Sequence, residues 1–124
     1  MANYNLYAHV VNNTSNDIKF SHVCKGTDEK PTEGQKGKLY HGEIVGKPTD
    51  LIRPGAVGTF TAKSTGETVQ GTAFYEVPGN TGDTWMYFHV PDYAKRHKQS
   101  ENVKVEVSGT THDKVVTYTI NKMA

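Results

Sequence analysis

The feature that most constrains this chain is the recurrence of apolar residues at every second position. Near the N-terminus one face of an extended segment would carry Tyr4, Leu6, Ala8 and Val10. Near the C-terminus the same spacing holds for Val103, Val105 and Val107. A period of two is that of a half-buried β-strand, and no window combines a helical period with helix caps. The sequence therefore predicts an all-β fold.

Turn-forming residues divide the chain into about eight short strands. The clearest turns are rich in Asn, Asp, Gly, Ser and Thr and lie at residues 12–17, 64–67, 78–83 and 109–113. The strands on either side of the first turn are predicted to pair as a hairpin. Further strands are predicted at 57–63, 69–77, 85–90, 103–107 and 115–120, with a weak one around 39–45. Short, evenly spaced strands favour an antiparallel β-sandwich, and 124 residues suit one domain spanning 1–124.

Composition excludes several classes of protein. The chain has 14 basic and 13 acidic residues, and this balance argues against a nucleic-acid partner. A single cysteine, Cys24, leaves no internal disulfide, and no apolar stretch approaches the ~20 residues of a spanning helix. Residues 1–4 have neither the basic start nor the apolar stretch of a signal peptide, so we expect synthesis in the cytoplasm without one.

The residues that could carry catalysis or bind a metal are few. None of the six histidines pairs with a Cys, Asp or Glu at zinc-ligand spacing, so no metal and no cofactor are predicted. His22 and Cys24 would share one face of a strand, but a cysteine nucleophile also needs an accessible, electropositive setting and an orienting group. We therefore expect no catalytic site. A hydrolase, as the alternative, would lose activity when His22 or Cys24 is changed.

Two loops differ in composition from the strands. Residues 25–38 consist almost wholly of Gly, Lys, Glu, Thr and other polar residues, so little is available to bury and a long mobile loop is predicted. Residues 94–102 are polar and basic and contain the run Lys95, Arg96, His97 and Lys98. Both segments are expected at the surface.

Residues 74–98 hold six of the 12 aromatic residues. Along the strand at 85–90, Trp85, Tyr87 and His89 would face one way, and Met86, Phe88 and Val90 the other. If only one set fills the core, the other leaves large rings at the surface, where Trp and Tyr favour the lipid–water boundary. The alternative is that both faces are buried and the basic loop is merely solvated.

The first of these two interpretations predicts a membrane-binding surface. Its aromatic and basic members are Trp85, Tyr87, Tyr93, Tyr75, Lys95, Arg96 and Lys98. The rings would enter the lipid interface, and the cations would attract anionic headgroups.

The order of these segments resembles that of the aegerolysins, small β-sandwich proteins of fungi and bacteria. The resemblance rests on residues 6–19, 71–74, 86–93 and 115–120, and it covers nearly the whole chain. The closing segment, VVTYTI, is most similar to bacterial members, which include the small component of two-component insecticidal crystal toxins. Fungal members usually carry Asp-Cys before the proline of the aromatic segment and Trp after it. Here His89 and Val90 precede Pro91, and Tyr93 follows.

The resemblance implies a membrane-binding, pore-forming type of toxin protein. Its partners would be a lipid of the target-cell membrane and, for many members, a larger toxin protein that completes the pore. Such a protein acts outside the producing cell, at the membrane of its target. A second hypothesis is a lectin-like module that uses the same rings to bind a glycan receptor, because β-sandwiches host both functions.

Overall fold

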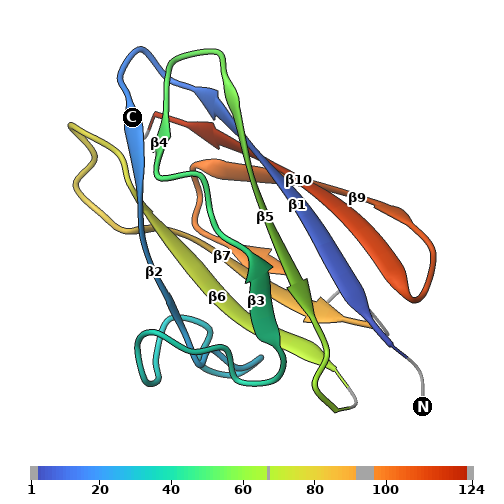
Figure 1. The fold of residues 1–124 in the computed structure, drawn as a ribbon. Helices are drawn as coiled ribbons and strands as arrows, with labels where there is room; N and C mark the ends of the chain where they lie inside the picture. Colours follow the sequence, from blue (N-terminus) through green and yellow to red (C-terminus); the bar gives the residue numbers. More distant parts are fainter. Residues whose placement is uncertain (1–2, 67, 92–96, 123–124) are drawn as a thin grey trace.

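The computed structural model describes residues 3–66, 68–91 and 97–122, and it shows a β-sandwich of two mostly antiparallel sheets (Figure 1). The described strands are β1 (Asn5–Asn13), β2 (Ile18–Cys24), β3 (Glu43–Gly46), β4 (Leu51–Ile52), β5 (Val57–Lys63), β6 (Val69–Glu76), β7 (Thr84–Val90), β8 (Lys98–Gln99), β9 (Val103–Gly109) and β10 (Asp113–Asn121). The predicted fold class is confirmed. The two additional strands, β4 and β8, have two residues each, which is too short to give a periodic signal.

Each sheet has five strands. The first sheet has the order β3-β5-β1-β10-β9, and the second has the order β4-β2-β6-β7-β8. The first and last long strands, β1 and β10, pair in parallel at the centre of the first sheet, from Asn5 opposite Asp113 to Asn13 opposite Asn121. All the other strand pairs are antiparallel. Strands from the two ends of the sequence therefore lie side by side in the middle of one sheet.

The predicted hairpin of the first two strands is wrong. β1 and β2 belong to different sheets, and the turn between them carries the chain from one layer of the sandwich to the other. The side chain of Asn12 holds this corner, because its Nδ2 donates to the carbonyls of Asn16 and Ile52, each at 2.8 Å. A polar turn of this length fits either connection, so the local pattern did not distinguish them.

The core lies between the two sheets. The first sheet contributes alternate residues of its strands, including Leu6, Val10 and Tyr118, all with no exposed surface. The second sheet contributes Met86, Phe88 and Val90, which are equally buried. This arrangement follows from the pleat, because only every second side chain of a strand points into the sandwich.

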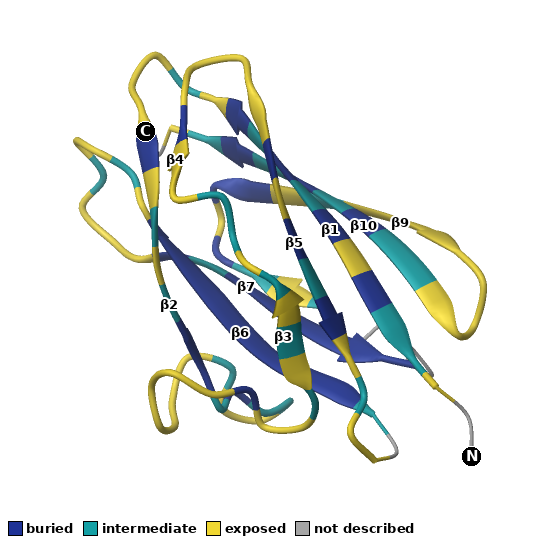
Figure 2. Ribbon diagram, in the orientation of Figure 1, coloured by how far each residue is buried: buried dark blue, intermediate teal, exposed yellow. Residues whose placement is uncertain are grey.

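The outer faces of the two sheets differ. In the first sheet, burial alternates along β1 and β5, as expected for strands with one wet face (Figure 2). In the second sheet, β6 is buried at every position except its last, and β7 at every position except Trp85. Another segment of the chain must therefore cover part of the outer face of the second sheet.

Candidate binding surface on the second sheet

The cover is the segment of residues 25–42, which we call the strap. Its backbone pairs with the edge of β2, because the amide of Gly37 donates to the carbonyl of Val23 at 2.8 Å and Lys36 forms a bridge with Cys24. Within the strap the amide of Lys25 donates to the carbonyl of Gln35 at 3.0 Å. At its far end His41 and Gln70 exchange two backbone hydrogen bonds, of 3.0 and 2.9 Å. The loop expected for 25–38 is present, but it is folded against the sheet rather than detached from it.

Side chains on the outer face of the second sheet form hydrogen bonds with the strap. The hydroxyl of Thr72 on β6 donates to the carbonyl of Pro31, and the ammonium of Lys98 on β8 donates to the carbonyl of Asp28. The strap therefore crosses the sheet from β2 to β8. Residues 25–38 contain no apolar side chain except that of Pro31, so polar contacts rather than apolar burial hold this part in place.

The outer-face residues beneath the strap are buried. Cys24, Thr72 and Tyr87 lie side by side on β2, β6 and β7, and each is 1% exposed or less. The hydroxyl of Tyr87 accepts a hydrogen bond of 2.8 Å from the side-chain amide of Gln70. A polar strap over a partly polar face thus accounts for the continuous burial of β6.

Next to the strap the same face carries three aligned rings, which we call the aromatic row: His22, Phe74 and Trp85. Phe74 pairs with His22 on β2 and with Trp85 on β7. The His22 and Phe74 rings stack with centroids 4.5 Å apart and planes 10° from parallel. Phe74 is buried between its neighbours, whereas His22 and Trp85 are half-buried. The row therefore offers solvent an amphipathic surface.

Charged and polar groups surround His22. The hydroxyl of Ser21 lies 2.8 Å from its Nδ1. Partial burial lowers the pKa of His22, and the ammonium of Lys36 on the strap lowers it further, while the carboxylate of Asp83 acts in the opposite direction. The neutral imidazole is therefore favoured around neutral pH, and the row meets solvent as an uncharged set of rings.

Cys24 does not have the properties of a reactive thiol. It is buried beneath the strap, and its Sγ lies 3.8 Å from the carbonyl oxygen of Glu33. Burial raises the pKa of this thiol, outweighing the opposing effects of the Thr72 hydroxyl and Lys36. Since the thiolate is the nucleophile, this setting disfavours the chemistry that a pair of His22 and Cys24 would need. Among the described residues no three His, Cys, Asp or Glu side chains gather as metal ligands would.

The predicted membrane-binding residues are only partly brought together. Trp85 reaches the surface within the aromatic row, and Lys98 is exposed beside the strap. Tyr93, Lys95 and Arg96 lie outside the described residues.

For two tyrosines the expected surface position is wrong. Tyr87 has no exposed surface, because the strap covers it. Tyr75 lies on the opposite face of the sheet, within the core. Its ring packs edge-to-face with that of Phe20, with the two ring centroids 5.5 Å apart. The prediction missed His22 and Phe74 as partners of Trp85, because strand pairing and not local sequence aligns them.

No protein-family model matches the chain, and no curated protein matches it at a significant level. In the described part of the chain there is no helix long and apolar enough to cross a bilayer.

Proposed function

We propose that this protein binds the surface of target-cell membranes as a toxin component of the aegerolysin type. In this proposal it is the small recognition protein of a bacterial insecticidal, pore-forming toxin. It acts outside the producing cell, alone or with a larger partner protein, by binding and assembly rather than by catalysis. The observation that carries the proposal is the partly exposed Trp85 at the end of the aromatic row.

The physical basis is the preference of indole rings for the region of lipid headgroups, where an apolar ring body and a polar N–H are both accommodated. Phe74 is buried and lies directly opposite Trp85 on the neighbouring strand, so the two side chains share one face of the sheet. The backbone of Trp85 is also fixed, because its amide donates to the Ser100 Oγ at 3.0 Å and its carbonyl accepts a hydrogen bond from the Ser100 amide at 3.1 Å. The backbone that carries the ring is therefore ordered before binding, which lowers the entropy cost of placing the ring in the interface.

Nearby cations support the same proposal. Lys36 on the strap and Lys98 on β8 are both exposed. Each cation close to an anionic membrane contributes about 1 kcal/mol of attraction at physiological ionic strength. Binding is therefore expected to strengthen with the anionic lipid content of the membrane and to weaken with added salt.

Sedimentation with vesicles of insect gut lipids tests the proposal. We expect the wild-type protein to sediment with the vesicles, and Trp85→Ala to lower the partition coefficient about tenfold, because the substitution removes one large interfacial side chain. Tyr7→Ala is the matched control, since Tyr7 is an exposed aromatic residue, 42% exposed, on the outer face of the other sheet. Failure of the wild type to bind, or an equal loss in both variants, would contradict the proposal.

A glycan receptor is the second candidate ligand. The observation in its favour is that polar groups border the aromatic row, with the Ser21 hydroxyl at His22 and the Asp83 carboxylate near it. Rings flanked by a few hydrogen-bonding groups are typical of small-ligand sites. Saturable binding to a defined glycan on an array, together with no sedimentation on protein-free vesicles, would favour this candidate over the first.

A further inference from the structure

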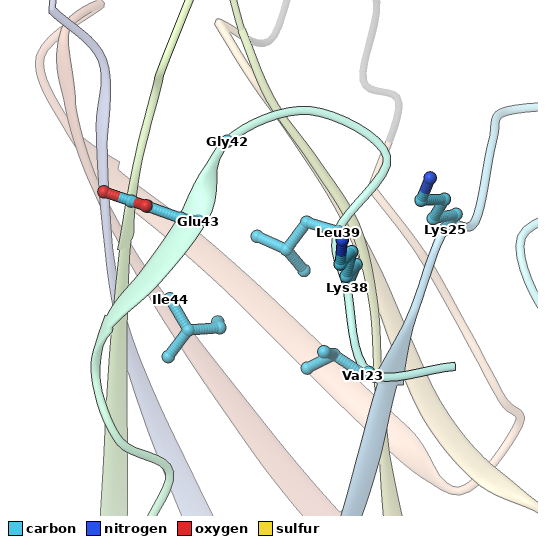
Figure 3. Close-up of a pocket in the computed structure, with 8 residues that line it drawn as sticks. Val23, Lys25, Lys38, Leu39, Gly42, Glu43 and Ile44 are labelled. Atoms are coloured by element: carbon cyan, nitrogen blue, oxygen red, sulfur yellow. The ribbon is translucent and has the colours of Figure 1, made fainter. Parts of the chain in front are cut away.

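A pocket of about 440 Å³ opens at the edge of the sandwich, at the junction of its two sheets (Figure 3). Its walls come from β2 of the second sheet, from β3 at the edge of the first, and from the two ends of the strap. The lining residues are Val23, Lys25, Gly37, Lys38, Leu39, Gly42, Glu43 and Ile44. The volume falls within the range of about 300–1,000 Å³ that small-molecule sites occupy.

The inner wall of this pocket is aliphatic. Val23, Leu39 and Ile44 point toward a common space in Figure 3. Val23 and Leu39 belong to the hydrophobic core, and Ile44 packs against it. Leu39 packs closely against Gly71, where a Cβ would lie only 2.7 Å from the Leu39 Cδ2. The pocket thus reaches the core through a fixed apolar wall.

The charged residues at the mouth of the pocket differ in whether they form ion pairs. Lys25 and Lys38 lie on the same side of the pocket in Figure 3, and neither forms an ion pair within residues 3–66, 68–91 and 97–122. Glu43 points away from both lysines, and its carboxylate lies 3.7 Å from the ammonium of Lys63. Two cations that form no ion pair with any described residue therefore lie beside an apolar wall.

We propose that this pocket binds an amphiphile with one acidic headgroup and an aliphatic body. The aliphatic part lies against Val23, Leu39 and Ile44, and the carboxylate or phosphate accepts charge-assisted hydrogen bonds from Lys25 and Lys38. A cationic or neutral amphiphile would leave the two ammonium groups without an anion. The site is separate from the aromatic row, because Val23 faces the core and the row lies on the outer face of the same sheet.

Fluorescence titration with 11-(dansylamino)undecanoic acid tests this assignment directly. The probe carries a carboxylate and an aliphatic chain, and its emission rises in an apolar site. We expect saturable binding with one molecule per chain. Dodecanoate should displace the probe, and dodecanol should displace it at least tenfold less well. Equal displacement by dodecanol, or no saturable binding, would overturn the proposal.

Two pairs of variants localise the site. Lys25→Met with Lys38→Met should weaken probe binding about tenfold, whereas Lys47→Met with Lys104→Met removes two exposed cations elsewhere and should leave it unchanged. Ile44→Trp should fill the pocket and abolish binding, and Val45→Trp, at the neighbouring 53% exposed position, should not. Unchanged binding in both pocket variants would overturn the assignment.

The ligand could be a free amphiphile or a lipid within a bilayer, and vesicle sedimentation of the same variants distinguishes the two. If the Lys25 and Lys38 variant loses probe binding and also loses more vesicle binding than the Lys47 and Lys104 variant, the pocket receives a bilayer lipid. If it loses only the probe, the ligand is a free amphiphile. The proposal does not depend on the membrane function, because the probe is titrated in solution without vesicles and Trp85→Ala should bind it normally.

Discussion

Asn12 shows how one polar residue fixes the relation between the two sheets. It is fully buried at the end of β1, and all its side-chain hydrogen-bonding groups are occupied. Its Nδ2 donates to the carbonyls of Asn16 and Ile52, and its Oδ1 accepts from the backbone amide and the hydroxyl of Thr14, at 2.9 and 2.6 Å. The sequence places it in a polar turn and gives no indication that it is buried.

Replacing Asn12 by alanine should therefore destabilise the protein strongly. We expect a loss of about 2–4 kcal/mol in the free energy of unfolding, because the carbonyl of Ile52 is left buried without its donor. Urea denaturation followed by circular dichroism measures this loss. Asn13→Ala is the control, since Asn13 is exposed and makes one side-chain bond, to Asn121, so it should cost under about 1 kcal/mol. Similar losses in the two variants would contradict the role assigned to Asn12.

His22 gives the stability a defined pH dependence. Burial and Lys36 lower its pKa in the folded state below the ordinary value of 6.5, so protonation favours the unfolded chain. The contribution of the neutral ring is complete above pH 6.5 and is lost as the pH falls through the folded-state pKa. Between pH 8 and pH 5 the wild type should therefore lose more stability in urea denaturation than His22→Gln. Parallel losses in the two proteins would show that His22 is not responsible.

At the scale of the elements, the strap explains most of the difference between expectation and structure. The period of two predicted β5 at residues 57–63, with the bounds that the structure shows. This worked because the buried and exposed faces of a strand appear in its own sequence as alternating apolar and polar residues. The same pattern did not predict the burial of Tyr87. The strap that covers Tyr87 has almost no apolar residues, so its sequence resembles that of a solvated loop. Likewise, the parallel pairing of β1 with β10 joins residues more than 100 positions apart, which no local pattern records.

The strap also provides a measurable opening reaction, because the only cysteine of the chain lies beneath it. Cys24 should react slowly with a thiol reagent in the folded protein, since the strap covers it and burial raises the pKa of its thiol. Lys98→Met removes the donor to the Asp28 carbonyl and should accelerate labelling at least threefold. Lys104→Met, a substitution on β9 far from the strap, is the control. Equal labelling rates in the two variants would contradict the view that Lys98 holds the strap closed.

At the scale of the whole molecule, the two sheets present different surfaces to a partner. The first sheet offers an open, alternating face, with Tyr7 among its exposed residues. The second is half covered by the strap and half open at the aromatic row. The proposed lipid surface and the proposed amphiphile pocket thus lie on different sides of β2, so that each can be altered without the other.

The proposed membrane surface places the only tryptophan of the chain, Trp85, at the lipid contact. Its fluorescence therefore reports the central claim without a label. On mixing with vesicles of anionic insect gut lipids, the emission should shift to shorter wavelength, and lipids brominated near the headgroup should quench it more than lipids brominated at the chain ends. Sedimentation of the protein with the same vesicles, with no shift and no quenching, would contradict the account, because a membrane contact that leaves Trp85 in water cannot be the aromatic row.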